Sequence, residues 1–162
     1  MKVITFLRHS KSSWDYEILD IHRPLSAVGI EKIKKTANSS KDHFISSEII
    51  YTSSANRALY TSILLAKSLS INFRKIKICD ELYTFSFTEV MEFIRTIDNN
   101  YSNVVLVGHN PAYTEISNYF SENKILNLPT ARWFSLKFES DNWSDIIDLK
   151  PISYLNNLKS GV

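Results

Sequence analysis

Arginine and histidine residues follow three apolar runs of this 162-residue chain. Arg8 and His9 come directly after the run KVITFL, and His109 comes directly after the run NVVLVG. Arg57 lies shortly behind a third run, EIIYT, where a helix is expected to begin. Guanidinium groups match phosphate oxygens bidentately, and helix N-termini favour anions. The residue types and their positions therefore indicate a phosphate-binding site.

The elements that must position these residues are alternating strands and helices. Buried strands are predicted at 2–7, 48–52 and 103–108, a further strand at 75–79, and helices at 26–41, 55–70, 87–98 and from Pro111 onward. Ser26 and Asn110 are predicted to cap the N-termini of the first and last of these helices. Two later segments, 132–138 and 143–149, alternate like strands. This order predicts an α/β fold with a mostly parallel central sheet.

Such a fold brings the polar residues together. In open α/β sheets, ligands bind outside the carboxyl ends of the strands. The arginines, the histidines and the helix N-termini all follow strands, so we expect them to converge at that edge of the sheet.

The composition limits the kinds of protein that this chain can be. A net charge of +2 does not indicate a nucleic-acid partner or a membrane surface. Three glycines are too few for a dinucleotide-binding fingerprint or a Walker A loop, and the single cysteine, Cys79, excludes an internal disulfide and a multi-cysteine zinc site. No apolar run is long enough for a membrane span or a signal peptide. We expect a single cytoplasmic domain over residues 1–162.

Four motifs resemble those of one known family. LRHSKSSW is similar to the motif that opens the histidine phosphatase superfamily, which includes the cofactor-dependent phosphoglycerate mutases. SSANRALYT and VLVGHNP resemble the family's second arginine motif and second histidine motif, in the same order. With HRPLS between them, the pattern looks most like the SixA-type phosphohistidine phosphatases. This resemblance implies a three-layer α/β/α sandwich of the phosphoglycerate mutase-like type.

The resemblance also implies roles for individual residues. His9 would be the nucleophile that takes up the phosphoryl group, and Arg8, Arg57 and His109 would clamp its oxygens. Arg23, in HRPLS, either binds phosphate or holds its loop. Ser10 and Ser12, which follow the nucleophile, are expected to contribute to phosphate binding. No metal or organic cofactor is implied.

The general acid is where the chain departs from the family pattern. The segment in which many members carry a catalytic glutamate reads CDELYTFSF here, and Glu81 is its candidate acid. A surface carboxylate is the alternative interpretation of Glu81. An alkoxide leaving group benefits from a proton donor by roughly 10²- to 10⁴-fold, whereas imidazole leaves phosphorus more easily. A site without a strong acid therefore favours a phosphoramidate substrate.

Three functions follow from these observations. The first is a phosphatase that hydrolyses phosphohistidine on a partner protein, such as a histidine phosphotransfer domain. The second is a broad or small-molecule phosphomonoesterase of the same superfamily. The third is a phosphate-binding module without catalysis, which the intact set of arginines and histidines disfavours. Outside this set, His22 and His43 are predicted at the surface and Cys79 as a buried apolar side chain.

Overall fold

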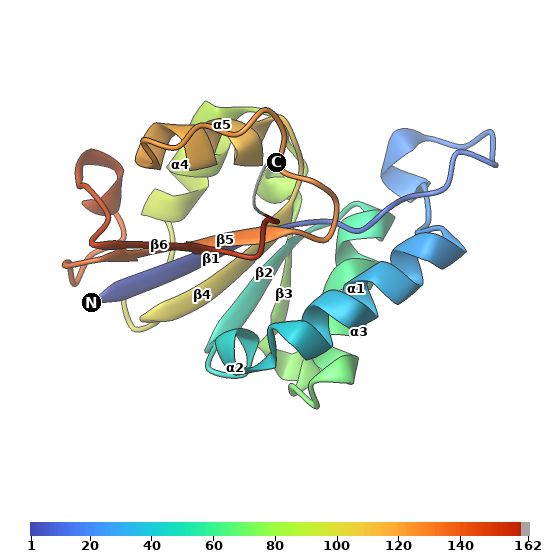
Figure 1. Cartoon of the computed structure of the whole chain (residues 1–162), viewed down its shortest axis with the longest axis horizontal. Helices are drawn as coiled ribbons and strands as arrows, with labels where there is room; N and C mark the ends of the chain where they lie inside the picture. The colour runs from blue at the N-terminus through green and yellow to red at the C-terminus, as the bar shows by residue number, and fades with distance from the viewer. Residues whose placement is uncertain (160–162) are drawn as a thin grey trace.

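A six-stranded sheet forms the centre of the structure, with strand order β3-β2-β4-β1-β5-β6 (Figure 1). The computed structural model describes residues 1–159, and residues 160–162, which the predicted domain includes, lie outside the described residues. The strands are β1 (Lys2–Arg8), β2 (Ile49–Ser53), β3 (Ile76–Cys79), β4 (Asn103–Gly108), β5 (Trp133–Phe138) and β6 (Ser153–Asn156). The first four are mutually parallel, β5 is antiparallel to β1, and β6 is antiparallel to β5. The predicted mostly parallel sheet is confirmed.

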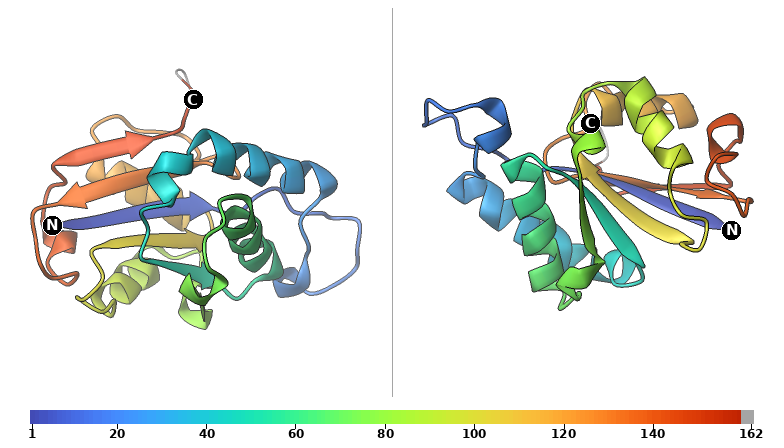
Figure 2. Two further views of the ribbon diagram at one scale, coloured as in Figure 1. Left: turned by 90° about the horizontal axis from the view of Figure 1, so that it is seen from below. Right: turned by 180° about the vertical axis from the view of Figure 1, so that it is seen from behind.

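Helices cover both faces of this sheet. Helices α1 (Ala27–Ser39), α2 (Lys41–Phe44) and α3 (Asn56–Ser68) lie on one face, and α4 (Phe87–Arg95) and α5 (Ala112–Phe120) lie on the other (Figures 1 and 2). Four short 3-10 turns complete the elements: η1 (Asp20–His22), η2 (Phe73–Lys75), η3 (Asp80–Leu82) and η4 (Ile146–Asp148). The three-layer α/β/α sandwich predicted from the family resemblance is therefore confirmed.

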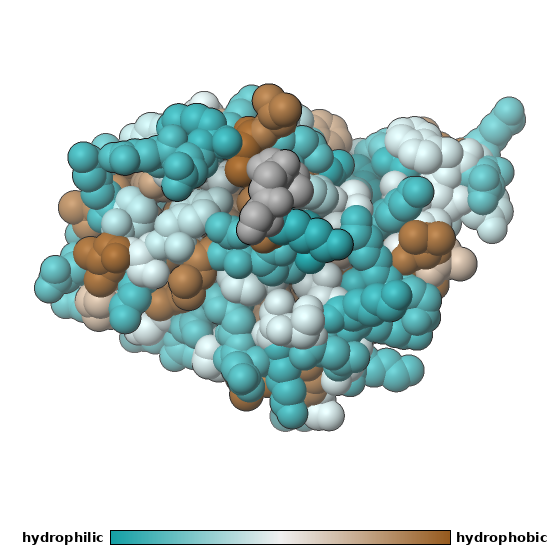
Figure 3. Space-filling view, in the orientation of Figure 1, coloured by the Kyte–Doolittle hydropathy of each residue, from teal (hydrophilic) through white to brown (hydrophobic). Residues whose placement is uncertain are grey.

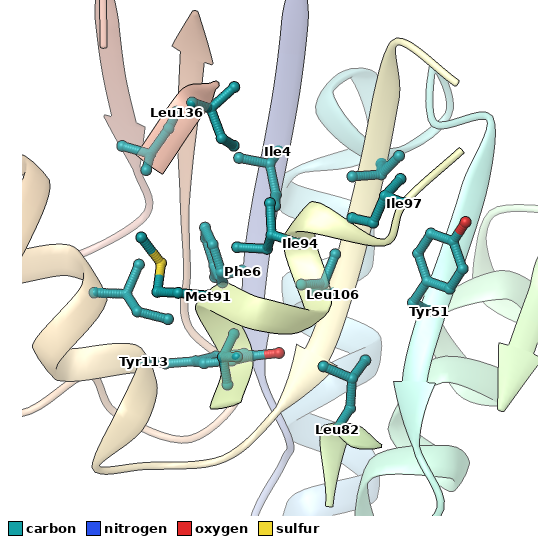
Figure 4. Packing of buried hydrophobic residues seen from close by; sticks show 14 of the residues in the cluster. Ile4, Phe6, Tyr51, Leu82, Met91, Ile94, Ile97, Leu106, Tyr113 and Leu136 are labelled. Carbon is teal, nitrogen blue, oxygen red and sulfur yellow. The ribbon is translucent and has the colours of Figure 1, made fainter. Parts of the chain in front are cut away.

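Strand β4 has a continuous apolar run because helices cover both of its faces. Val104 and Leu106 belong to the core under α4 and α5, whereas Val105 and Val107 belong to the core under α1 and α3. Successive side chains of a strand point to opposite faces, so a strand covered on both faces buries every residue. Figure 4 shows Leu106 in the first of these cores, to which Phe6 and Met91 also belong.

The predicted N-terminal cap is confirmed for α1 and is wrong for α5. Ser26 caps α1 as predicted, and its hydroxyl accepts a hydrogen bond from the Gly29 N–H. In α5 the cap position is occupied by Pro111 rather than Asn110. The Asn110 side chain still accepts a hydrogen bond from the Thr114 N–H, at 3.2 Å, one turn into the helix.

The last predicted strand is wrong. Residues 143–149 form a loop that ends in η4, and the sixth strand comes later, at Ser153–Asn156. The indole N–H of Trp143 donates to the carbonyl of Tyr101, and both Trp143 and Ile146 are buried in the core under α4 and α5. Their spacing of three residues suits a turn that returns to the same face, which a strand cannot provide.

The molecular surface is mainly hydrophilic on the face seen in Figure 3, where apolar side chains form small separate areas. Among residues 1–159, no helix is both long enough and apolar enough to cross a membrane.

Candidate active site

The two histidines follow adjacent parallel strands. Arg8 and Gly108 are paired in the register of β1 and β4, and the His9 N–H donates to the Gly108 carbonyl at 3.0 Å. The chain leaves β1 toward α1 on one face and leaves β4 toward α5 on the other. This divergence is the topological switch point at which open α/β sheets bind ligands. The rings of His9 and His109 consequently lie 5.1 Å apart, centroid to centroid.

A pocket of about 290 Å³ opens at this point. Its walls include the predicted residues Arg8, His9, Ser12, Arg23, Arg57 and His109. Three elements supply the central groups: the end of β1, the first turn of α3 and the end of β4. The structure thus brings together Arg8 and His109, which are 101 positions apart in the sequence.

His9 is held neutral and in one tautomer. Burial lowers the pKa of His9 to about 3; the hydrogen bond to the Ser10 carbonyl opposes this shift, and the nearby charges of Arg57 and Arg8 reinforce it. The His9 Nδ1 lies 2.7 Å from the Ser10 carbonyl oxygen, which can only accept a hydrogen bond. The proton of the neutral ring therefore resides on Nδ1. The lone pair on Nε2 is free to act as a nucleophile.

Three buried nitrogen atoms around His9 have no hydrogen-bond partner among residues 1–159: Arg8 Nε, Arg57 Nε and His109 Nδ1. Each of these side chains is anchored by another atom. Arg8 Nη1 donates to the Leu128 carbonyl at 2.8 Å, and His109 Nε2 lies 2.8 Å from the Ser53 hydroxyl. Buried polar atoms are normally paired, so several unpaired ones at a single pocket indicate a ligand that supplies acceptors. An anion with several oxygens fits this arrangement.

The charge state of His109 fits the same arrangement. Burial, followed by the positive charge of Arg57, lowers the pKa of His109 to about 2, so its ring is neutral. When the Ser53 hydroxyl donates to Nε2, the ring proton lies on Nδ1, the atom without a partner. His109 then offers a hydrogen bond to an anion in the pocket.

Asp20 is a site residue that the sequence analysis missed. It lies in η1 and lines the pocket, and its carboxylate accepts from Arg57 Nη2 at 2.9 Å and from Arg23 Nε at 3.1 Å. The Tyr83 hydroxyl donates to the same carboxylate at 2.6 Å. Burial acts to raise the pKa of Asp20, but the hydrogen bonds from Tyr83 and Arg57 and the charge of Arg57 outweigh it and lower the pKa to about 2. Asp20 is therefore an ionised carboxylate that bridges Arg23 and Arg57.

Arg23 lies in the pocket wall and is also part of its loop. Besides the ion pair with Asp20, its Nη1 donates to the Ser12 hydroxyl. Its guanidinium carbon lies 3.7 Å from the centre of the Trp14 ring, a cation–π contact. The two roles weighed for Arg23 from the sequence are thus compatible, because the contacts that hold the loop leave Arg23 in the pocket wall.

Two predicted site residues are not at the pocket. Ser10 is fully buried, and its hydroxyl donates to the Gly29 carbonyl at 2.6 Å, so it fastens the loop to α1. Glu81 is exposed and lines a different hollow together with Glu89 and Glu92. In the turn η3 the buried side chain is Leu82, and this leaves Glu81 outside the active-site pocket. Neither residue is placed to act on a ligand beside His9.

The remaining predictions for single residues have mixed outcomes. Cys79 is buried and His22 is exposed, as predicted. The surface prediction is wrong for His43, which is half-buried, stacks on Trp133 at 4.0 Å and lies 2.8 Å from the Thr5 hydroxyl through its Nε2. Within the described residues, no group of three or more His, Cys, Asp or Glu side chains is placed to hold a metal ion.

Comparison with known proteins identifies the fold. No protein-family model and no curated protein matches the sequence. Among solved structures, a protein from Agrobacterium tumefaciens described as the phosphohistidine phosphatase SixA superposes with a TM-score of 0.77 at 20% identity, over 95% of this chain and 97% of that chain. The protein histidine phosphatase SixA in complex with tungstate gives 0.74 at 19% identity, over 96% and 94%.

A third similar structure has a different described substrate. A protein from Escherichia coli described as an α-ribazole-5′-P phosphatase superposes with a TM-score of 0.67 at 16% identity, over 88% of this chain and 93% of that chain. All three identities are low, so the similarity concerns the fold. The resemblance read from the sequence motifs is confirmed at that level: the chain has the phosphoglycerate mutase-like fold of the histidine phosphatases, in the form seen in SixA.

Proposed function

We propose that this chain is a metal-independent phosphatase that removes the phosphoryl group from phosphohistidine on a partner protein. The observation that carries the proposal is the neutral His9, with its Nε2 lone pair free, beside three buried nitrogen atoms without partners. A nucleophile and a set of donors for phosphate oxygens are the two requirements of phosphoryl transfer to an enzyme side chain.

The reaction proceeds in two displacements. In the first, His9 Nε2 forms a bond to phosphorus while the bond from phosphorus to the substrate's imidazole nitrogen breaks, and the substrate ring, protonated on its other nitrogen, leaves as neutral imidazole. Arg8, Arg57 and His109 donate hydrogen bonds to the phosphoryl oxygens, where negative charge must be stabilised. In the second, a water oxygen bonds to phosphorus, the bond to His9 breaks, and inorganic phosphate leaves. One difficult hydrolysis is thereby divided into two easier steps.

The acid–base character of the pocket supports phosphohistidine over a phosphate ester. Asp20 is the carboxylate of the described chain that lines the pocket, and its pKa of about 2 leaves it without a proton to donate. An alkoxide leaving group needs such a proton, whereas a phosphorylated imidazole ring that already carries a proton on its other nitrogen leaves as neutral imidazole without one. The SixA-like fold points in the same direction.

A small-molecule phosphomonoesterase is the second candidate. It is favoured by the α-ribazole-5′-P phosphatase, which has the same fold and a small phosphate ester in its description. The two candidates differ in the leaving group that the pocket must accept, so direct comparison of substrates separates them.

The test is intact-protein mass spectrometry without an acid quench. A histidine phosphotransfer domain phosphorylated on histidine, and separately p-nitrophenyl phosphate, are incubated with wild type, His9→Ala and the control His22→Ala, which changes an exposed histidine. We expect His9-dependent loss of phosphate from the protein, slow turnover of the ester, and a phosphoryl adduct on wild type and His22→Ala. Brisk ester turnover with an untouched phosphoprotein would favour the second candidate.

A further inference from the structure

Large apolar side chains are exposed on the long connection between β1 and α1. Trp14, Tyr16, Ile18 and Leu19 are 78%, 61%, 46% and 71% exposed, respectively. We call residues 14–19 the apolar loop; in Figure 1 the connection that contains it projects from the body of the molecule. Four such side chains within six residues form an apolar surface. Surfaces of this kind mark interaction sites, whereas single exposed apolar residues are common on any protein.

The apolar loop is attached to the pocket at both of its ends. Trp14 lines the pocket and packs on Arg23, and Leu19 directly precedes Asp20, which also lines the pocket. Phe85, 47% exposed, is a further aromatic group in the pocket wall. The apolar surface is therefore continuous with the rim through which a phosphoryl group must enter.

Basic side chains also gather beside the pocket. Lys11 lines it, and Lys32 Nζ donates to the hydroxyl of Thr130, another lining residue, at 2.9 Å. Burial lowers the pKa of Lys32, and the positive charges of Arg132, Arg8 and Lys11 lower it further. For a chain with a net charge of only +2, this is a local concentration of positive charge. Asp15 and Glu17 alternate with the apolar residues on the loop itself.

We propose that the apolar loop is the docking surface for the protein that carries the phosphohistidine, and that this carrier presents acidic side chains to the basic group beside the pocket. The inference rests on the proposed function. A pocket of about 290 Å³ has room for a phosphoryl group and an imidazole ring, so the rest of the carrier must lie on the rim. Exposed aromatic and aliphatic side chains there supply affinity, and charge complementarity supplies orientation.

The test compares the rate at which the same phosphorus–nitrogen bond is hydrolysed in a carrier protein and in free phosphohistidine. Tyr16→Ser combined with Ile18→Ser removes two side chains of the apolar loop that do not line the pocket. The control is Phe73→Ser combined with Ile152→Ser, which removes side chains of similar exposure, 54% and 56%, near the opposite end of the sheet. Substrates are a histidine phosphotransfer domain of negative net charge, phosphorylated on histidine, and free phosphohistidine.

We expect the loop variant to lower kcat/KM for the phosphorylated domain by about tenfold, mainly through KM, with free phosphohistidine turned over at the wild-type rate. The control variant should match wild type on both substrates. Added NaCl should raise KM for the domain more than for free phosphohistidine, because charge pairs at an exposed rim are screened.

Three results would overturn the docking proposal. Equal losses on both substrates would mean that the loop supports the pocket rather than the partner. No loss on either substrate would mean that the carrier does not touch the loop. If wild type turned over p-nitrophenyl phosphate but neither phosphohistidine substrate, the proposed function itself would fail, and the docking proposal with it.

Discussion

At the scale of single residues, the guanidinium of Arg57 donates hydrogen bonds to two groups of Asp20. Its Nη atoms donate to the main-chain carbonyl of Asp20 at 2.8 Å and to the Asp20 carboxylate at 2.9 Å, while its Nε is buried without a partner. The Asp20 contacts fix the plane of the guanidinium, so the edge that carries Nε remains available to a ligand. Asp20 is in this sense a positioning residue for Arg57.

Asp20→Asn tests this positioning role. The amide keeps the size of the side chain but removes the charge that holds Arg57 and Arg23, and charge-assisted hydrogen bonds are about twice as strong as neutral ones. We expect kcat/KM for free phosphohistidine to fall about tenfold, with a parallel rise in the inhibition constant of tungstate. Steady-state kinetics with both compounds measures the effect, and thermal unfolding checks that the variant is folded.

The matched control for Asp20→Asn is Asp15→Asn, which changes an exposed carboxylate on the same loop and should leave both constants unchanged. A rise in activity in Asp20→Asn would contradict the positioning role. It would mean that the carboxylate competes with phosphate for Arg57.

The sequence could predict some of these residues and not others, for a physical reason. Arg8 ends a buried strand, and His9 and His109 directly follow buried strands, so the topology alone places them at one edge of the sheet. Asp20 is brought to Arg57 and Tyr83, 37 and 63 positions away, by the path of a loop that no periodic pattern encodes. The only local signal was its spacing of three residues from Arg23, which is common among exposed ion pairs.

At the scale of elements, α1 holds the loop that follows His9. The Gly29 carbonyl accepts from the Ser10 hydroxyl, and the helix cap Ser26 donates to the Lys11 carbonyl at 3.1 Å. A Cβ added at Gly29 would lie 2.0 Å from the Lys11 carbonyl oxygen and 2.9 Å from its carbon. The loop and the helix therefore approach at a distance that only glycine permits.

Gly29→Ala should consequently destabilise the protein although alanine is the better helix former. Alanine in a helix interior gains about 1 kcal/mol over glycine, but overpacking against main-chain atoms costs about 1–3 kcal/mol and shifts the loop. We expect a net loss of about 1 kcal/mol in the free energy of unfolding, measured by urea denaturation, together with weaker tungstate binding.

The adjacent substitution Val28→Ala is the control for this prediction, because Val28 is exposed and should change stability by less than about 0.5 kcal/mol. A stabilised Gly29→Ala would show that the loop does not pack this closely on α1 in solution.

The helices and strands were predictable wherever burial imposes a recognisable pattern of apolar residues on the sequence. The continuous apolar runs of β1, β2 and β4 indicated strands covered on both faces, and the structure has them there. Strand β6 was missed because it is a partly exposed edge strand, SYLN, with no buried residue to impose an alternation. The strand predicted at 143–149 was wrong because the loop, and not a strand of the sheet, carries Trp143 into the core.

For the molecule as a whole, the fold keeps the two histidines of the site, His9 and His109, in their neutral form. Burial is the largest cause that lowers the pKa of His9 and of His109, to about 3 and about 2, and it also lowers the pKa of His43. In the unfolded chain a histidine has a pKa of about 6.5. Between these values the unfolded chain binds protons that the folded chain excludes, so acidification favours unfolding.

The free energy of unfolding should therefore be independent of these histidines above about pH 7 and should fall as the pH drops below about 6.5. Two histidines that are fully protonated only when unfolded give a slope of roughly 2 kcal/mol per pH unit between about pH 6 and pH 4.5. Asp20 does not contribute there, because its lowered pKa affects stability only below the usual carboxylate range, near pH 4. Urea denaturation at a series of pH values measures this slope.

The combined variant His9→Gln and His109→Gln separates this cause from general acid sensitivity. Glutamine stays neutral, so the variant should lose most of the slope whatever its stability at pH 7, and the residual slope should come from His43. The comparison uses slopes rather than absolute stabilities because the substitutions also change packing and hydrogen bonds. An unchanged slope would mean that both rings accept protons in the folded state, and a protonated His9 could not supply the lone pair that the proposed reaction requires.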